Sequence, residues 1–358
     1  MLTEYQIQEI KVHLEKAQNP LFFFDNDNDG LISFFLLRRF IGRGKGVVIK
    51  SYPDLNQSYY RKVKELKPDY IFILDKPIVS EEFLEKIIAD NIPIVWIDHH
   101  QLDHQTSQQL EKHNLILEKH NLFYYYNPFL NNETSEPVSY LSYKIASKKE
   151  DIWLAIIGCI SDALIPDFYK EFYEKYPELG KKSPNSAFDL LYNSEIGKIA
   201  RILDFSLKDK TTNVINMLKF MIQVKSPYDI LEENQKTKQI LKRYNEINKK
   251  YQSLMCKARE KSSKKFIYFQ YSGQFSLSSN LANQLSYEFS EKIIVVVYIK
   301  DDIVNISLRG KNVRKLTLEA IKDIENATGG GHQDATGAKM SFSNLPKFKE
   351  NIERLVTI

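Results

Sequence analysis

The sequence is poor in cysteine and has no long hydrophobic run, and both absences narrow the classes of protein to which it can belong. Cys159 and Cys256 are its two cysteines and lie far apart, which excludes a disulfide framework and a cysteine-rich zinc site. No apolar run approaches the length that spans a membrane, and the polar start MLTEYQIQEI lacks the pattern of a signal peptide. We therefore expect a cytoplasmic protein with no membrane partner.

Length and composition indicate a globular protein of more than one domain. The chain has 358 residues, which exceeds what one hydrophobic core usually organises. Hydrophobic residues make up 43% and charged residues 27%, enough to build a core and a soluble surface. The net charge of +4 is compatible with binding to a polyanion but does not require it. We predict a catalytic domain over 1–195, a helical connector over 196–262 and a smaller domain over 263–358.

Short apolar segments alternate with helical patterns through the first part of the chain. Segments 21–24, 46–50, 70–74 and 93–97 are predicted strands, and their alternation with helices indicates a parallel sheet with ligands at its carboxyl edge. Residues 228–262 carry apolar residues at helical spacing among dense charge, which predicts a long connecting helix. Beyond it, strands and helices alternate again. The expected fold is α/β, with a parallel-sheet domain and a smaller C-terminal mixed α/β domain joined by a long helix.

Acidic residues and histidines follow the predicted strands at their carboxyl ends. The set consists of Asp25, Asp27 and Asp29 in DNDNDG, Asp75, the triplet Asp98-His99-His100, and Asp162 near the end of an apolar helix. Such carboxylates would repel one another unless a cation lies among them. Oxygen and imidazole ligands without thiolates suit Mn²⁺, with Mg²⁺ as the alternative. The ligands suffice for two divalent ions, an arrangement that hydrolyses phosphate esters.

Each of these signals has a less specific interpretation when it is taken alone. DNDNDG begins like a calcium-binding EF-hand loop, although Leu36 occupies the position of the required glutamate. An isolated Asp-His-His is more often a surface loop, and Asp75 alone is an ordinary residue at a strand end. The other histidines, such as His13, lie in polar stretches and are expected at the surface. The metal-site hypothesis depends on the whole set in this order.

Taken together, DNDNDG, a strand-ending aspartate, Asp-His-His, an aspartate after GCIS, and a late GGGH resemble the DHH phosphoesterase superfamily, in particular RecJ-like nucleases. The resemblance implies that Asp27 and Asp29 ligate metal ions, that Asp75 bridges two ions, and that His99 and Asp162 complete the second site. It further implies that His100 contacts the scissile phosphate and that Asp98 orients His99. Asp25 would be a ligand or an outer-sphere partner.

The C-terminal domain resembles the DHH-associated substrate-binding domain. There, the GGGH loop formed by Gly329, Gly330, Gly331 and His332 would bind the substrate's phosphate together with Arg309. Asn280 and Asn283, on a predicted helix, are further candidate substrate-binding residues. By itself GGGH is usually a flexible turn, and it gains weight from the upstream motifs.

The favoured function is a Mn²⁺-dependent phosphodiesterase or exonuclease that releases mononucleotides from single-stranded DNA or RNA or from short oligonucleotides. A second hypothesis is a non-catalytic scaffold for replication or repair proteins, against which the intact aspartates speak. A third is a phosphodiesterase for small molecules, namely cyclic dinucleotides, dinucleotides or adenosine bisphosphate. The sequence leaves open the cleavage polarity, the sugar preference and the oligomeric state.

Overall fold

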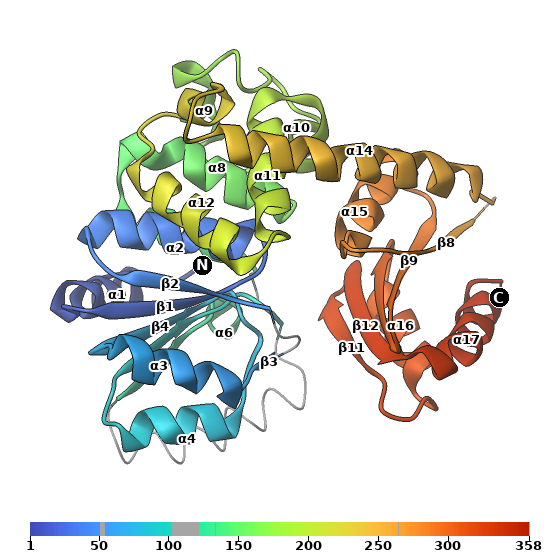
Figure 1. Ribbon diagram of the computed structural model, residues 1–358, viewed down its shortest axis with the longest axis horizontal. Helices are drawn as coiled ribbons and strands as arrows, with labels where there is room; N and C mark the ends of the chain where they lie inside the picture. The colour runs from blue at the N-terminus through green and yellow to red at the C-terminus, as the bar shows by residue number, and fades with distance from the viewer. Residues whose placement is uncertain (51–53, 102–121, 133, 264, 358) are drawn as a thin grey trace. The chain divides into compact units, whose positions relative to one another are not determined.

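The structure, a computed structural model, describes residues 1–50, 54–101, 122–132, 134–263 and 265–357. The chain divides into two compact units, Met1–Ile240 and Leu241–Ile358 (Figure 1). The division that we predicted at residues 195 and 262 stays a prediction, because compact units do not define the functional limits of a domain. Within the described residues, no helix is long and apolar enough to cross a membrane.

A five-stranded parallel sheet forms the centre of the first unit. Its strands lie in the order β2-β1-β4-β6-β7. They span Lys45–Ile49 (β2), Pro20–Asp25 (β1), Tyr70–Leu74 (β4), Ile94–Ile97 (β6) and Phe123–Tyr126 (β7). The chain proceeds from β1 to β2 on one side and then to β4 on the other, so the direction of winding reverses between β1 and β4. Ligands of open α/β sheets bind outside the carboxyl ends of the strands at such a switch point.

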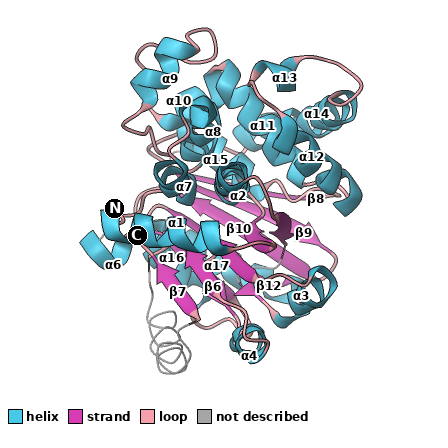
Figure 2. Ribbon diagram, turned by 90° about the vertical axis from the view of Figure 1, so that its left-hand side faces the viewer, coloured by secondary structure: helices cyan, strands magenta, loops and turns pink. Residues whose placement is uncertain are grey.

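Helices cover both faces of this sheet, as expected for strands that are apolar on both sides. On one face, Phe23, Ile73 and Trp96 pack in a core with α3 (Tyr60–Leu66) and α4 (Glu81–Ala89). On the other, the rings of Phe22 and Phe24 pack against Phe34 of α2 (Asn28–Ile41). Figure 2 shows α2 on one side of the strands and α4 on the other. The α/β fold with a parallel sheet is therefore confirmed.

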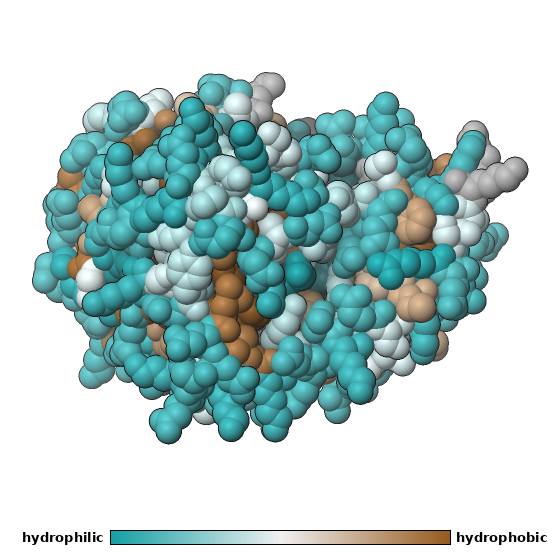
Figure 3. Space-filling view, turned by 90° about the horizontal axis from the view of Figure 1, so that it is seen from above, coloured by the Kyte–Doolittle hydropathy of each residue, from teal (hydrophilic) through white to brown (hydrophobic). Residues whose placement is uncertain are grey.

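The remaining elements of the first unit are mostly helices. They are α1 (Glu4–Lys16), α6 (Phe129–Asn132), α7 (Val138–Ala146), α8 (Ile152–Ser161), α9 (Tyr169–Lys175), α10 (Ala187–Asn193), α11 (Glu195–Leu207), α12 (Thr211–Gln223), α13 (Tyr228–Leu231) and the two-stranded pair β3 (Asp54–Leu55) and β5 (Ile78–Val79). Helix α8 is buried along most of its length, because nine of its ten residues are buried. The visible surface is largely hydrophilic (Figure 3).

The second unit begins within the long helix α14 (Lys238–Glu260), which starts ten residues later than the predicted start at 228. The cause is a local turn: the Asn234 side chain accepts hydrogen bonds from the backbone N–H groups of Lys236 and Thr237. Such side-chain bonds compete with a continuous helix and favour a new helix start. Tyr244, Ile247, Tyr251 and Met255 form the buried face of α14.

A mixed five-stranded sheet completes the second unit, with strand order β11-β12-β10-β9-β8. Its elements are β8 (Phe266–Ser272), α15 (Ser278–Glu288), β9 (Ile293–Lys300), β10 (Ile303–Arg309), α16 (Val313–Ile321), β11 (Thr328–His332), β12 (Ala335–Ser341) and α17 (Leu345–Thr357). β8 and β9 are parallel, and the other pairs are antiparallel. The smaller mixed α/β domain is therefore confirmed.

The GGGH sequence lies in a strand, so our expectation of a loop is wrong. Gly329, Gly330, Gly331 and His332 are the last four residues of β11, and His332 pairs with Ala335 across a two-residue turn. The glycines have a structural reason: a side chain at Gly331 would meet the backbone of Ala335, and its φ of +130° disfavours other residues. The run of three glycines suggested a flexible loop, but backbone pairing with β12 holds these residues in a strand.

Candidate metal centre

The DNDNDG segment forms the turn from β1 into α2. Asp25 ends the strand, and Asp27 caps the helix, its Oδ1 accepting a hydrogen bond of 3.0 Å from the Gly30 backbone N–H. Helix α2 begins at Asn28, inside the segment that an EF-hand loop would need, so the calcium-loop alternative is wrong. A Cβ at Gly30 would lie 2.7 Å from the Asp25 backbone nitrogen, which explains the glycine.

Asp29 links the first turn of α2 to the start of α7. Its carboxylate accepts hydrogen bonds from the backbone N–H groups of Val138 (2.7 Å) and Ser139 (2.8 Å) and from the Ser139 hydroxyl. The positive end of the α7 dipole and these donors stabilise the buried charge. Helix α8 passes so close that a Cβ at Gly158 would overlap Ser139. Three helices therefore fix the position of one carboxylate.

His99 lies at the centre of the cluster and is buried. Its Nε2 is 3.4 Å from Asp75 Oδ1, 3.6 Å from Asp162 Oδ2 and 3.9 Å from Asp29 Oδ2. Asp75 follows β4 with a φ of +57°, a left-handed conformation that costs a non-glycine residue about 1 kcal/mol. Asp162 is the C-cap residue of α8. Residues separated by more than a hundred positions thus converge at the carboxyl edge of the sheet.

The converging groups fit two neighbouring cations. One group consists of Asp25, Asp27 and Asp75, and another of Asp29, His99 and Asp162; within each, the candidate ligand atoms lie within 4.8 Å of one another. Ligands on opposite sides of a divalent ion lie about 4 to 5 Å apart, since each bond is about 2 to 2.5 Å long. Asp75 lies between the groups, because it belongs to the first and approaches His99 of the second.

The pKa values of the aspartates and of His99 in this cluster are raised, which means that the cluster favours bound positive charge. Burial, reinforced by the Asp162 carboxylate, raises the pKa of Asp29 to about 6, although His99 and Ser139 oppose the increase. Burial and the charges of Asp27 and Asp29 raise the pKa of Asp75 well above its usual value. Burial alone would lower the pKa of His99, but the surrounding carboxylates raise it well above the ordinary range. Metal ions displace such protons when they bind.

Asp98 contacts His100 directly, while the expectation that it orients His99 stays a prediction. Asp98 Oδ1 lies 2.8 Å from His100 Nδ1, and Asp98 Oδ2 accepts a hydrogen bond of 3.2 Å from the His100 backbone N–H. Burial alone would raise the pKa of Asp98, but the His100 imidazole holds it below its usual value. The Nδ1 of His99 instead faces Ser135, whose hydroxyl lies 3.2 Å away. No pattern in the sequence indicated Ser135.

Lys76 is a second residue that the sequence analysis missed. It follows Asp75, its side chain is 1% exposed, and its Nζ lies 2.7 Å from Asp25 Oδ1. Burial would lower the pKa of Lys76, but Asp25, with help from Asp75 and Asp27, raises it, so the lysine is charged. A lysine directly after an acidic strand end is the signal that was available. Asp25 therefore has a protein cation as its direct neighbour.

Arg309, His332 and Gly330 lie on one face of the mixed sheet. Gly329 and Gly331 alternate with them along β11 and face the other side, where a Cβ at Gly329 would meet Ile321 and Thr317 of α16. Arg309 and His332 both pair with Ala335, one from each neighbouring strand, and residues opposite one another share a face. Arg309 Nε donates a hydrogen bond of 2.5 Å to Asn283 Oδ1 on α15. A side chain at Gly330 would meet nothing within 4 Å. Asn280 is also on α15, where its carbonyl accepts a hydrogen bond of 3.2 Å from the Tyr251 hydroxyl.

Comparisons with known proteins bear on this architecture. Residues 263–357, a little over a quarter of the chain, match the model of the DHHA1 domain. No curated protein sequence matches the chain.

Solved structures resemble the chain over nearly its whole length. RecJ in complex with Mn²⁺ from Thermus thermophilus has a TM-score of 0.71 at 13% identity, covering 99% of this chain and 55% of that chain. An exonuclease RecJ bound to manganese has a TM-score of 0.63 at 15% identity, covering 99% of this chain and 95% of that chain. CDC45 from Entamoeba histolytica has a TM-score of 0.52 at 11% identity, with 99% of each chain covered.

The chain thus spans about half the length of the Thermus RecJ chain. At these identities the likeness shows the fold, while the DHHA1 match rests on sequence. The chain therefore has the same fold as these RecJ structures, and its residues 263–357 match the DHHA1 domain model.

Proposed function

We propose that the protein is a Mn²⁺-dependent phosphodiesterase that acts from an end of single-stranded or short nucleic acid and releases mononucleotides. The observation that carries the proposal is the convergence of aspartates from β1, β4 and α8 around His99. Two divalent ions would supply Lewis-acid stabilisation of the phosphoryl transition state and an activated water. The RecJ structures of the same fold, described as bound to Mn²⁺ or manganese, support the choice of metal.

The chain's own residues would divide the work between holding charge and binding phosphate. Asp27 and Asp75 would serve one ion and Asp29, His99 and Asp162 the other, with Asp75 shared between them. His100 would donate a proton or a hydrogen bond to the scissile phosphate, since Asp98 holds its ring by Nδ1. Asp25 would act from outside the ligand sphere, paired with Lys76.

In the second unit, we propose that Arg309, Asn283, His332 and Gly330 form a phosphate-binding face, with Asn280 at its margin, and that Gly329 and Gly331 contribute through the backbone of the same strand. Arg309 supports this role because its guanidinium is already oriented by Asn283 Oδ1 and by the backbone carbonyls of Leu308 and Thr336. A held guanidinium loses little freedom on binding a phosphate. The small residues of the face leave room for a ligand at Gly330.

The test is digestion of end-labelled DNA and RNA oligomers of graded length with Mn²⁺, with Mg²⁺ and with EDTA. We expect mononucleotides with Mn²⁺ and none with EDTA. Asp75→Asn, which keeps the size of the side chain but removes its charge, should abolish the products and lower the Mn²⁺ content measured by elemental analysis. Intact oligomers with Mn²⁺, or equal activity in Asp75→Asn, would contradict the proposal.

The same experiment separates the other hypotheses. Dinucleotides, cyclic dinucleotides and adenosine bisphosphate enter as parallel substrates, and a preference for them over all longer oligomers would assign a small-molecule phosphodiesterase. Absence of bound metal together with co-purification of replication proteins would assign a scaffold, a role that would still use the same fold.

A further inference from the structure

Helix α14 concentrates positive charge in the second unit. Its 23 residues include seven basic side chains and two acidic ones, Glu246 and Glu260, a net charge of +5 against +4 for the whole chain. Arg259 is held by Glu288 of α15 through two hydrogen bonds of 2.8 and 2.7 Å. The other basic residues are therefore the ones to examine for a ligand.

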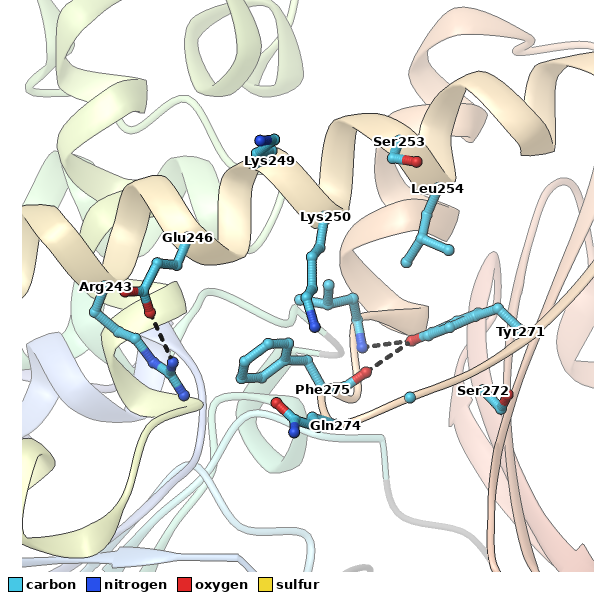
Figure 4. Close-up of a pocket in the computed structure, with 12 residues that line it drawn as sticks. Arg243, Glu246, Lys249, Lys250, Ser253, Leu254, Tyr271, Ser272, Gln274 and Phe275 are labelled. Carbon is cyan, nitrogen blue, oxygen red and sulfur yellow. Dashed lines mark hydrogen bonds and ion pairs between the residues drawn. The ribbon is translucent and has the colours of Figure 1, made fainter.

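A groove of about 670 Å³ runs along this helix and lies wholly within the second unit. On one side it is lined by residues of α14, and on the other by the end of β8 and the segment that follows it (Figure 4). The lining residues are Arg243, Glu246, Lys249, Lys250, Ser253 and Leu254 of α14, Tyr271 and Ser272 of β8, and Gly273, Gln274, Phe275 and Leu277. Glu246 is the one acidic lining residue, and it is paired with Arg243 at 3.0 Å. Because Arg243 and Glu246 offset one another, the two lysines of the lining, Lys249 and Lys250, give the groove a net positive charge.

Two cations approach one aromatic ring in this groove. The guanidinium of Arg243 lies 4.8 Å from the centroid of Phe275, and the Lys250 Nζ lies 5.3 Å from it. Figure 4 shows Lys250 directed towards the ring from the helix above it. A ring face attracts each cation, but the two positive charges repel one another. A bound anion would relieve that repulsion.

The opposite wall of the groove is fixed before any ligand binds. The Tyr271 hydroxyl accepts a hydrogen bond of 2.6 Å from the Leu277 backbone N–H, and the Tyr298 hydroxyl donates one of 2.8 Å to the Gly273 carbonyl. On the helix side, the Tyr251 hydroxyl donates to Gln284 Oε1 at 2.6 Å and so attaches α14 to α15. A preformed wall reduces the entropy cost of binding.

We propose that this groove binds the sugar-phosphate backbone of single-stranded nucleic acid, an inference that rests on the proposed function for the nature of the polyanion. Arg243 and Lys250 are seven residues apart, two helical turns, and therefore lie on the same side of α14 about 10 Å apart along its axis. A row of charges suits a linear polyanion better than a single phosphate. Phe275 is buried and supports the cations, so contacts are made to phosphates rather than to stacked bases.

The test measures binding of a fluorescein-labelled oligothymidylate of about 20 nucleotides to the full chain by anisotropy, in EDTA so that no cleavage occurs. The groove variant is Lys249→Glu with Lys250→Glu. The matched control is Lys347→Glu with Lys349→Glu, which changes the same number of exposed lysines in the same unit, on α17. Because both variants change the net charge equally, a difference between them reports the local site.

We expect the groove variant to bind at least about 10-fold more weakly than the wild type and the control to stay within about 3-fold. The slope of log K against log salt should become shallower by about 1.4 in the groove variant, or about 0.7 for each phosphate that the variant no longer neutralises. Lys249→Gln with Lys250→Gln should give an intermediate affinity. Equal affinity of groove and control variants, or an unchanged salt slope, would overturn the inference.

Failure of this inference is distinguishable from failure of the proposed function. Hydrolysis is measured on the wild type with Mn²⁺, whereas groove binding is measured on variants without metal. If the wild type hydrolyses oligomers but the groove and control variants bind with equal affinity, the groove inference is refuted and the proposed function stands.

Discussion

Replacing Lys76 by methionine tests whether a buried protein cation stabilises the acidic cluster. Methionine keeps the length of the side chain and removes the charge, leaving Asp25 beside Asp27 and Asp75 with no ammonium group at 2.7 Å. Removing one partner of a buried ion pair costs about 3 to 5 kcal/mol. Because the Asp25 side chain is 28% exposed, we expect the lower end, about 3 kcal/mol.

The assay is thermal unfolding in EDTA at neutral pH, followed by circular dichroism. A loss of about 3 kcal/mol in a unit of this size corresponds to a fall of about 6 to 12 °C in melting temperature. Lys76→Met combined with Asp25→Asn removes both charges and should regain most of that loss, which a double-mutant cycle measures. Mn²⁺ should raise the melting temperature of Lys76→Met more than that of the wild type, since a divalent ion restores the missing positive charge.

Three results would refute this reasoning. The first is a melting temperature for Lys76→Met within about 2 °C of the wild type, which corresponds to less than about 1 kcal/mol. The second is a double variant as unstable as the single one. The third is an equal response of both proteins to Mn²⁺, which would mean that the lysine and the metal ions act on separate charges.

Three further predictions concern other parts of the molecule. Gly158→Ala should displace Ser139 from Asp29, lowering stability by about 1 to 3 kcal/mol and weakening Mn²⁺ binding in calorimetry; unchanged Mn²⁺ affinity would contradict it. Burial alone would raise the pKa of Asp189, but Lys181 and Asn193 lower it to about 2, so this carboxylate stabilises the fold above pH 4 and the contribution disappears as the pH falls towards 2. Asp189→Asn should therefore cost about 2 kcal/mol in urea unfolding at pH 6, and progressively less below pH 4. Arg309→Gln should raise KM for oligonucleotides about 10-fold or more with little change in kcat, because a phosphate contact away from the reacting atoms contributes uniform binding; a fall in kcat alone would exclude that role.

The sequence predicted the position of the acidic cluster because a general rule of folds places it there. Parallel strands end at one edge of the sheet, so Asp25, Asp75 and His99 meet there whatever the details of the helices. The periodicity of the apolar residues likewise predicted both sheets and the long helix. These features depend on patterns that are local in sequence, and the structure confirms them.

The contacts that hold each candidate metal ligand in place were not predictable in the same way. Asp29 is bound by Val138 and Ser139, more than a hundred residues away, and no local pattern joins these positions. His13 was expected at the surface, yet it is buried with its ring 4.0 Å from that of Tyr124. Burial lowers its pKa, in keeping with an uncharged ring. In both cases the partner comes from another element, and only the three-dimensional packing identifies it.

The left-handed backbone of Asp75 places stability in conflict with the proposed activity. Glycine would adopt that conformation without strain, and it would also remove one carboxylate from a crowded group. Selection for thermal stability alone would therefore favour losing this side chain. An engineering programme that screens heated lysates should therefore also measure the proposed activity at every round, because its most heat-resistant clones would include proteins that lack this proposed metal ligand.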